Sequence, residues 1–545
     1  MDIELKDFNV RVHEQDEAGS SSNTRTNYSI STAEDDPVEA PEIPPARFWG
    51  LCVGLYTIGL DFEILENVNW VALAYTLAYL GCAIVFSRVS DVIGRRDAFI
   101  AAYVIFFIFS LACGFAQSID QLIAFRALQG IGGSGLYSLT MIILPELSPS
   151  SLKQHIGALV GMVITLSAVL GPVLGGVLTQ YSSWRWIFWI NGPVGFVSLV
   201  IFFLTWPKAE YLPSEQRRAW RELDYLGSFL AISAAVLVVF AFQTAGTERS
   251  NNGWKSALFI APLVCGVLAW GLLIAWQIFL QHRWHDRFAP SFPINIFRNK
   301  VYAAAVVNTL LNGFPYLLLI YAIPLRIQVV SGKSALTAGV MLLPMLGTSA
   351  LGSMLAGRIN STKNYTFESL LAGSCFMTLG CGLLISLSHE SDDAKLLGYT
   401  TFCGLGFGLT VASSMMQSTV EVPIRDFAPA QGILSQVRLL GGSLGIAVSS
   451  ALLNQKSSKH LTGVLTPLEQ ATIDGPNTNL SSSQWSAVRY TYSDAFKAEM
   501  KVATAVAACA VICTFGAVRK QRLLIDEQRA AIVAEEAARR RGQAA

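Results

Sequence analysis

Charged side chains are scarce in this sequence. Only 14% of its 545 residues are Asp, Glu, Lys or Arg, whereas a soluble domain carries roughly a quarter. A soluble chain of this length would also divide into several domains joined by polar linkers. The formal net charge is +1, and no basic stripe offers a footprint for phosphates. These shortages exclude nucleic acid as a partner and argue against a soluble protein.

The residue patterns of enzymatic sites are also lacking. The cysteines lie within apolar runs and have no metal-ligand spacing with histidine, which predicts that they are small packing residues between helices. The sequence contains no nucleophile–base pair and no phosphate-binding loop. We therefore expect no metal and no cofactor, and a membrane enzyme is the least supported class. The polar first forty-odd residues predict no cleavable signal peptide. The cysteines are Cys52, Cys82, Cys113, Cys265, Cys375, Cys381, Cys403, Cys509 and Cys513.

Long apolar runs are abundant instead. Hydrophobic residues make up 52% of the chain. Many apolar runs are long enough to cross a bilayer as a helix, which takes about 20 residues. We predict an all-α polytopic membrane protein with about fourteen spans. The predicted spans cover residues 48–65, 70–87, 98–116, 121–144, 155–178, 187–206, 224–245, 256–280, 301–323, 335–357, 367–388, 395–418, 430–453 and 500–518.

An internal repeat divides these spans. The stretch 130–158 is a Gly-rich helix, a Pro/acid loop and a second helix, and the stretch 404–434 repeats that plan. Parallel halves of this kind are typical of one large class of transporters. We predict a disordered cytosolic tail (residues 1–45) followed by a six-span half (46–206). Two extra spans with cytosolic linkers (207–300) lead to a second six-span half (301–518) and a cytosolic C-terminal tail (519–545).

The distribution of Lys and Arg predicts the orientation. Placing both termini in the cytosol puts most of the basic short loops inside, and the long loop 454–499 then lies outside. Asn479 of that loop starts an Asn-Leu-Ser sequon and is a candidate glycosylation acceptor. Sequons at Asn360 and Asn364 fall on the cytosolic side and should stay unmodified. We expect the plasma membrane as the location, with the vacuolar membrane as the alternative.

Three motifs carry candidate functional residues. The string SRVSDVIGRR, from Ser87 to Arg96, places an acid and arginines in a tight turn, where a charge cluster can latch helix ends in one conformation. The alternative is an ordinary basic loop. The string FRALQGIGGSG places Arg126 within an apolar helix, which by default marks function, although an arginine near the interface can also snorkel. The same two alternatives hold for Arg438. The string LGPVLGG combines a bending proline with packing glycines.

Taken in this order, the motifs resemble those of the major facilitator superfamily. Fourteen spans with the Gly-Pro-x-x-Gly-Gly string resemble its fourteen-span drug:proton antiporters, and the segment from Trp70 to Pro207 is most similar to fungal efflux members. The resemblance implies gating by Asp91, Gly94, Arg95 and Arg96, proton coupling by Arg126, and an antiporter signature of Gly171, Pro172, Gly175 and Gly176. Ser87 stands where the family usually has Gly.

The first span departs further from the family pattern. Relatives have a Leu-Asp-x-Thr string, a further apolar stretch and a sizeable outer loop, whereas here Leu60 and Asp61 lead almost directly to Asn69 and Trp70. Relative to this pattern, about half a span and its loop are missing. By resemblance, Asp61 would face the central cavity and take part in transport and proton coupling. The shortening predicts reduced stability and poor transport.

The sequence as a whole predicts a transporter that works by alternating access. A small amphipathic organic molecule, such as a drug, toxin or secondary metabolite, would be exported in exchange for protons. The direction comes from the family resemblance. The alternatives are an uptake transporter and, because of the short first span, a non-transporting membrane sensor or inactive transporter.

Overall fold

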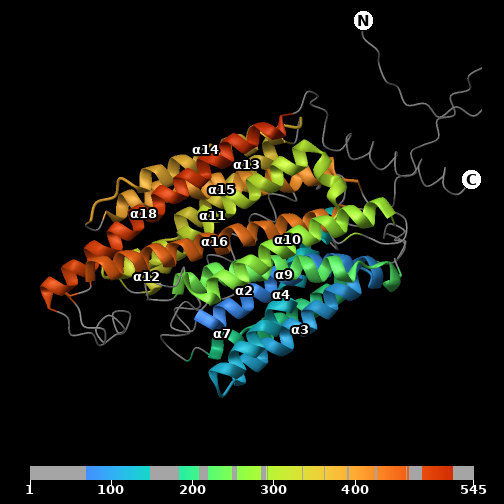
Figure 1. Cartoon of the computed structure of the whole chain (residues 1–545), viewed down its shortest axis with the longest axis horizontal. Coiled ribbons are helices and arrows are strands. Elements are labelled where there is room, and N and C mark those ends of the chain that lie inside the picture. The colour runs from blue at the N-terminus through green and yellow to red at the C-terminus, as the bar shows by residue number, and fades with distance from the viewer. Residues whose placement is uncertain are drawn as a thin grey trace, which may run out of the picture. The chain divides into compact units, whose positions relative to one another are not determined.

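The structure is a computed structural model and consists of helices throughout its described part (Figure 1). It describes residues 69–147, 183, 185–207, 219–247, 255–283, 290, 292–333, 335–360, 363–389, 392–423, 426–461, 463–464 and 481–518. The α-helices of this part are α2 (Asn69–Ile93), α3 (Arg95–Phe115), α4 (Ile119–Leu147), α7 (Arg185–Trp189), α8 (Asn191–Thr205), α9 (Tyr225–Thr247), α10 (Ala257–Arg283), α11 (Lys300–Val329), α12 (Ala335–Val340), α13 (Leu343–Ile359), α14 (Thr366–Leu384), α15 (Asp393–Glu421), α16 (Phe427–Leu461) and α18 (Ser482–Thr514). Short 3₁₀ helices are η3 (Trp220–Glu222), η5 (Ile294–Arg298) and η7 (Phe515–Ala517).

Within these ranges, 12 helical segments are long and apolar enough to cross a membrane. Helices suit this role because a lipid core offers no partner for free backbone N–H and C=O groups. The predicted spans 48–65 and 155–178 lie outside the described residues. The all-helical membrane fold is therefore confirmed, and the total of fourteen spans stays a prediction.

Two of the spans are broken helices. The segment Arg185–Thr205 divides into α7 and α8 just before Gly192 and Pro193, and α12 gives way to α13 just before Pro344. Proline has no N–H to donate and its ring crowds the preceding turn, so a helix tends to restart at it. The breaks therefore follow directly from the positions of these residues.

Helices α16 and α18 extend beyond the apolar runs from which they were predicted. Residues of the predicted outer loop 454–499 continue α16 as far as Leu461, and α18 already begins at Ser482. Ser481 and Gln484 form a capping box at the start of α18. An ion pair of 2.7 Å between Lys456 Nζ and Asp494 Oδ2 joins the two extended ends. The loop is consequently shorter than predicted, and Glu499 lies inside a helix.

Glycines allow the helices of each half to pack closely. In the first half, α4 packs against both α2 and α3, and Gly130 and Gly132 lie against the backbones of Tyr75 and Phe106, where a Cβ would collide. In the second half, α15 packs against α13 and α14. Small residues are what lets membrane helices approach to this extent, and this agrees with the interpretation of the Gly-rich string in α4.

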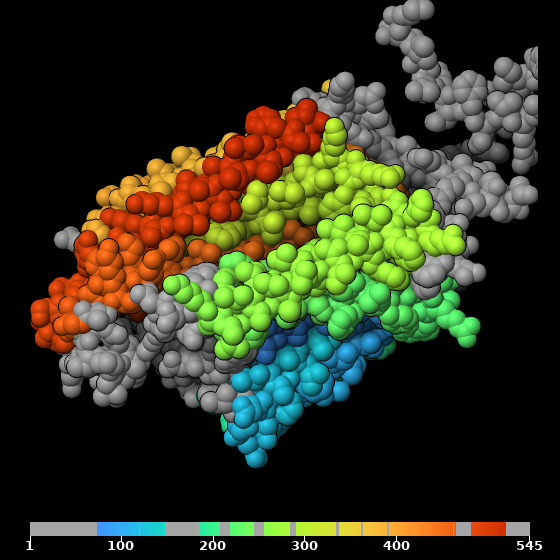
Figure 2. All heavy atoms as spheres, viewed as in Figure 1, coloured from blue at the N-terminus to red at the C-terminus, as the bar shows by residue number. Residues whose placement is uncertain are grey.

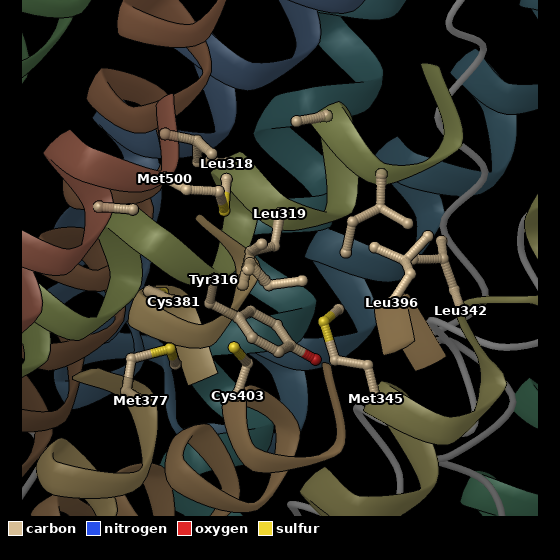
Figure 3. Packing of buried hydrophobic residues seen from close by; sticks show 14 of the residues in the cluster. Tyr316, Leu318, Leu319, Leu342, Met345, Met377, Cys381, Leu396, Cys403 and Met500 are labelled. Carbon is tan, nitrogen blue, oxygen red and sulfur yellow. The ribbon is translucent and has the colours of Figure 1, made fainter. Parts of the chain in front are cut away.

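The second half has a large core of its own, rich in sulfur-containing and aromatic side chains (Figure 3). Tyr316 of α11 and Phe407 of α15 stack in this core with parallel rings. Met377, Cys381 and Cys403 are fully buried beside them. Thioethers and thiols adapt to irregular gaps between helices, so Cys381 and Cys403 fill space here as predicted. Cys265, Cys375 and Cys509 are exposed instead, so the prediction of packing between helices is wrong for these three.

Helix α16 connects the two halves and the intervening helices. It packs against α11 and α18 of its own half and against α2, α4 and α9, and Figure 1 shows it in orange beside α9. Helix α10 covers α9 and forms a ridge on the face seen in Figure 2. Its apolar residues, among them Leu258, Val267 and Leu272, are exposed, as expected for a helix that faces lipid.

Candidate functional site

The first predicted motif forms the turn between α2 and α3. Gly94 has a φ of 95°, a conformation that side chains with a Cβ rarely adopt. This glycine lets α3 begin at Arg95 directly after α2 ends at Ile93. Asp91 at the end of α2 and Arg95 at the start of α3 are thereby brought into contact.

A charge cluster is built on this turn. The Asp91 carboxylate accepts hydrogen bonds from Arg95 Nη1 at 2.7 Å and from Arg88 Nη1 at 3.2 Å. Arg95 also donates from Nε and Nη2 to the two oxygens of Glu146 in α4, at 3.0 and 3.1 Å. A bidentate arginine–carboxylate pair of this kind fixes the orientation of the two side chains as well as their separation. The motif therefore ties the ends of α2, α3 and α4 together, through a glutamate that no sequence pattern linked to it.

The same cluster reaches the second half of the molecule. Arg88 is 1% exposed; its Nη2 lies 3.8 Å from Asp426 Oδ1 and donates to the backbone carbonyl of Pro290. Gly432 of α16 faces Ser87, and a Cβ at Gly432 would lie 3.1 Å from Ser87 Oγ. The larger residue at Ser87 is thus accommodated by a glycine on the opposite helix. We call Arg88, Asp91, Arg95, Glu146 and Asp426 the charge latch.

Arg96 does not join the charge latch. Its side chain is exposed, and its guanidinium carbon lies 5.5 Å from the ring centroid of Phe203 in α8. The structure therefore brings together Asp91, Gly94 and Arg95 of the four residues that the resemblance assigns to gating, and it places the fourth on the outside of the bundle.

Arg126 is buried inside the first half. It is 3% exposed, donates from Nη1 to Gln129 Oε1 at 2.9 Å, and lies over the Tyr75 ring with 4.2 Å between the guanidinium carbon and the ring centroid. A snorkelling arginine extends its charge towards water and headgroups, whereas this guanidinium is held among helices by an amide and an aromatic face. The geometry favours a functional charge over the snorkelling alternative.

A row of tyrosines leads from Arg126 towards the second half. Ring centroids are 5.7 Å apart between Tyr75 and Tyr79 and 6.1 Å apart between Tyr79 and Tyr137. The Tyr137 hydroxyl accepts a hydrogen bond of 2.8 Å from Arg438 Nη1 in α16. We call these five residues the tyrosine row. Tyr79, Tyr137 and Arg438 are only half-buried, so the row presents aromatic faces and a guanidinium where the two halves meet.

Three further ionisable residues are buried that the sequence patterns do not identify. Glu499 lies within the predicted outer loop 454–499, Arg326 follows the predicted span 301–323, and Asp224 is the first residue of the predicted span 224–245. All three are almost fully buried. Asp224 accepts from the side chains of Trp276 and Gln277 and so joins α9 to α10. The polar stretch before Glu499 continues α18 as a helix, and this helical continuation is the signal that would place Glu499 in a span. The length of apolar runs alone does not detect it.

Several predicted site residues lie outside the described residues. These are Asp61, Gly171, Pro172, Gly175, Gly176 and Asn479. Their roles stay predictions. In the part of the chain that the structure describes, no group of three or more His, Cys, Asp or Glu residues could hold a metal ion.

The helices are long enough to cross a membrane and form two halves, and the charge latch lies where these halves meet. Together with the buried charges, this arrangement defines a multi-pass membrane transport protein. The chain belongs to the Major Facilitator Superfamily, whose family model matches residues 48–446. It is a transporter and not an enzyme.

Fungal transporters are among its relatives. The MFS-type transporter FPY5 of Fusarium mangiferae is 32% identical over 447 residues, which cover 80% of this chain and 74% of that protein. The efflux pump roqT of Penicillium rubens is 28% identical over 88% of this chain and 94% of that protein. The solved structure of the human organic anion transporter MFSD10 (TETRAN) has a TM-score of 0.53 at 15% identity and covers 84% of this chain and 100% of that chain. A bacterial homologue of the human lysosomal transporter Spinster, in an inward-facing state, has a TM-score of 0.54 at 15% identity and covers 86% of this chain and 96% of that one. These two structures support the fold.

Proposed function

We propose that the protein exports small amphipathic organic molecules, such as drugs, toxins or secondary metabolites, across the plasma membrane in exchange for protons. The observation that carries this proposal is the tyrosine row, because it lies where the two halves meet. Flat aromatic faces attract apolar ring systems, and the half-buried guanidinium group of Arg438 attracts polar or anionic groups. The names of fungal relatives as efflux pumps support the direction.

The charge latch supplies a means of alternating access. Arg88 joins the first half to Asp426 across the end of the bundle that the basic loops predict to be cytosolic. While these contacts hold, the halves are closed at that end, and a substrate between them is released on the other side. Separation of Arg88 from Asp426, and of Ser87 from Gly432, opens the cytosolic end for loading. The salt-bridge network within the first half holds the ends of α2, α3 and α4 as one unit during this motion.

Proton coupling is proposed for the buried Arg126. Its charge lies among apolar and aromatic side chains, where it disfavours other cations and favours a nearby carboxylate. By family resemblance, Asp61 would be that carboxylate. Protonation of the acid would weaken its attraction to Arg126. Proton binding would in this way change the relative position of the two halves.

Vesicle transport tests the proposal against its alternatives. Inside-out membrane vesicles that contain the protein are acidified inside, and accumulation of a fluorescent amphipathic dye is followed with and without a protonophore. The expected result is accumulation that the protonophore abolishes. Accumulation only in right-side-out vesicles would indicate uptake, and no flux in either orientation would indicate a sensor or an inactive transporter. A deletion strain, screened for lost export of toxins and of its own secondary metabolites, identifies the substrate.

A further inference from the structure

Glu499 is a buried carboxyl group near the middle of α18, which belongs to a membrane-crossing segment. It is 3% exposed. Its neighbours Phe496 and Met500 on the same helix pack into the sulfur-rich core of the second half, and Figure 3 shows Met500 pointing into that core. An acidic residue at such a depth is costly to keep and marks a functional site unless a partner neutralises it.

Its described partner is a neutral one. Glu499 lies beside the hydroxyl group of Ser449 in α16, and no ion pair within the described ranges includes it. The charged groups on the packed elements are engaged elsewhere. Arg326 of α11 lies over the Phe496 ring, 5.1 Å from the ring centroid, and Lys456 of α16 pairs with Asp494. Lys501, two residues along α18, is exposed.

The other titratable groups on these elements do not supply a counter-charge. Helix α11 contributes Tyr316 and α14 contributes Cys381, and both are neutral side chains of the sulfur-rich core. The single carboxyl group of α14, Glu368, is in its first turn. An ionised carboxylate without a cation is strongly disfavoured in such surroundings, whereas a neutral acid needs only a neutral polar neighbour such as the Ser449 hydroxyl group.

Titratable side chains lie between Glu499 and the end of the bundle opposite the charge latch. Asp494 lies five residues earlier in α18, about 7.5 Å along the helix axis, and its side chain is 27% exposed. On the α16 side, His460 Nε2 lies 3.7 Å from Asp494 Oδ2. Both Asp494 and Glu499 contact α16, so they follow one seam between α16 and α18 from the predicted outer surface inwards.

We propose that Glu499 is a proton-binding site of the second half and exchanges its proton with the outer compartment along the seam between α16 and α18. The inference rests on the proposed proton antiport and adds a proton site that is independent of Asp61 and Arg126. Protonation keeps α16 and α18 packed around a neutral acid. Loss of the proton leaves a charge that this packing does not tolerate, so the occupancy of the site by a proton biases the conformation of the second half.

Infrared spectroscopy and transport test the proposal together. Purified protein in liposomes is titrated while the carbonyl band of protonated carboxylic acids is recorded. The isosteric Glu499→Gln variant is expected to lack a protonated-carboxyl band that wild type shows, whereas Asp120→Asn, at an exposed position at the start of α4, keeps it. In acidified vesicles, Glu499→Gln is expected to equilibrate substrate but to lose at least tenfold in proton-driven accumulation.

The outcomes separate this inference from the proposed function. Unchanged spectra and unchanged proton-driven accumulation in Glu499→Gln would overturn it. If wild type shows no proton-driven export, the proposed function fails, and the proton site then depends on the infrared result alone. If Glu499→Gln does not insert, Ser449→Ala replaces it, because removal of the donor disfavours the carboxylate and should move the loss of the band to higher pH. An unchanged titration in Ser449→Ala would then contradict the site.

Discussion

Single residues in this protein differ in importance even where the sequence makes them look equivalent. Arg95 and Arg96 are neighbours in one motif, yet Arg95 donates to two carboxylates and Arg96 lies exposed beside Phe203. One residue of rotation around a helix of 3.6 residues per turn is enough to separate them. Buried charges with fixed partners are therefore the residues at which substitutions should have the largest effects.

Replacement of Arg126 by Ala is expected to abolish proton-coupled transport and leave the protein inserted in the membrane. The substitution removes the cation from above the Tyr75 ring and from Gln129 Oε1. Vesicle accumulation measures the loss, and surface labelling measures insertion. Arg126→Lys keeps the charge and should retain part of the activity. Wild-type transport by a correctly folded Arg126→Ala variant would restore the snorkelling interpretation.

The two arginines of the α2–α3 turn provide a matched pair. Arg95→Gln leaves Asp91 and Glu146 without their shared cation, and breaking such a part-buried pair costs up to about 3 kcal/mol. We expect a clearly lower thermal unfolding midpoint in detergent. Arg96→Gln removes an exposed charge and should change stability by less than about 0.5 kcal/mol. Equal effects of the two substitutions would mean that the charge latch does not explain the motif.

At the scale of helices, close approach at glycines determines which elements can meet. Helices α2 and α16 belong to different halves, and Gly432 permits their contact at Ser87. A Cβ at Gly432 would lie 3.1 Å from Ser87 Oγ and 3.5 Å from Ile84 Cα, so a branched side chain there would press α2 and α16 apart. Helix contacts of this kind are therefore sites where a single substitution can alter the balance between conformations.

Gly432→Val is expected to hold α2 and α16 apart and to favour the state that is open at the end of the charge latch. A cysteine introduced at Ser87 should react faster with a membrane-impermeant maleimide applied from the cytosolic side. Gly398→Val is the control, because a Cβ at Gly398 in α15 would meet no atom within 4 Å. Equal labelling rates in the two variants would show that this contact does not hold the halves closed.

The first span gives a second prediction for an element. The apolar stretch from Phe48 to Leu60 is about 20 Å long as a helix, against a hydrocarbon core of about 30 Å, and these residues lie outside the described ones. We expect that restoring a full-length span and outer loop raises surface expression and efflux. Equal export by the unmodified chain would mean that bilayer thinning or tilt accommodates the short span.

For the molecule as a whole, the predicted topology places the charge latch on the cytosolic side and opens the seam near Glu499 to the outer side. The orientation predicts that Asn479 is glycosylated and that Asn360 and Asn364 are not. Asn360 is buried and donates to the Ala356 carbonyl at 2.7 Å, which is a second reason to expect that it stays unmodified.

Treatment with a glycosidase should therefore shift the electrophoretic mobility of wild type, and Asn479→Gln should remove the shift. Asn360→Gln should leave it in place. Labelling of a cysteine at Asn479 from the cytosolic side only would reject the orientation, and with it the direction in which the charge latch and the seam between α16 and α18 are assigned.

The sequence by itself determined the membrane class, the helical fold and the family, because apolar run length and short motifs are local properties that survive without tertiary information. It also identified Asp91, Gly94, Arg95 and Arg126. It did not find Glu146, Asp426 or the tyrosine row, because these residues meet only when distant helices pack. Apolar run length likewise placed Glu499 in a loop, since a helix that is polar on one side does not form an apolar run. Only the tertiary structure decided that Arg95 is paired and Arg96 exposed, and that Glu499 is buried beside Ser449, because burial and partners depend on which faces of neighbouring helices come together.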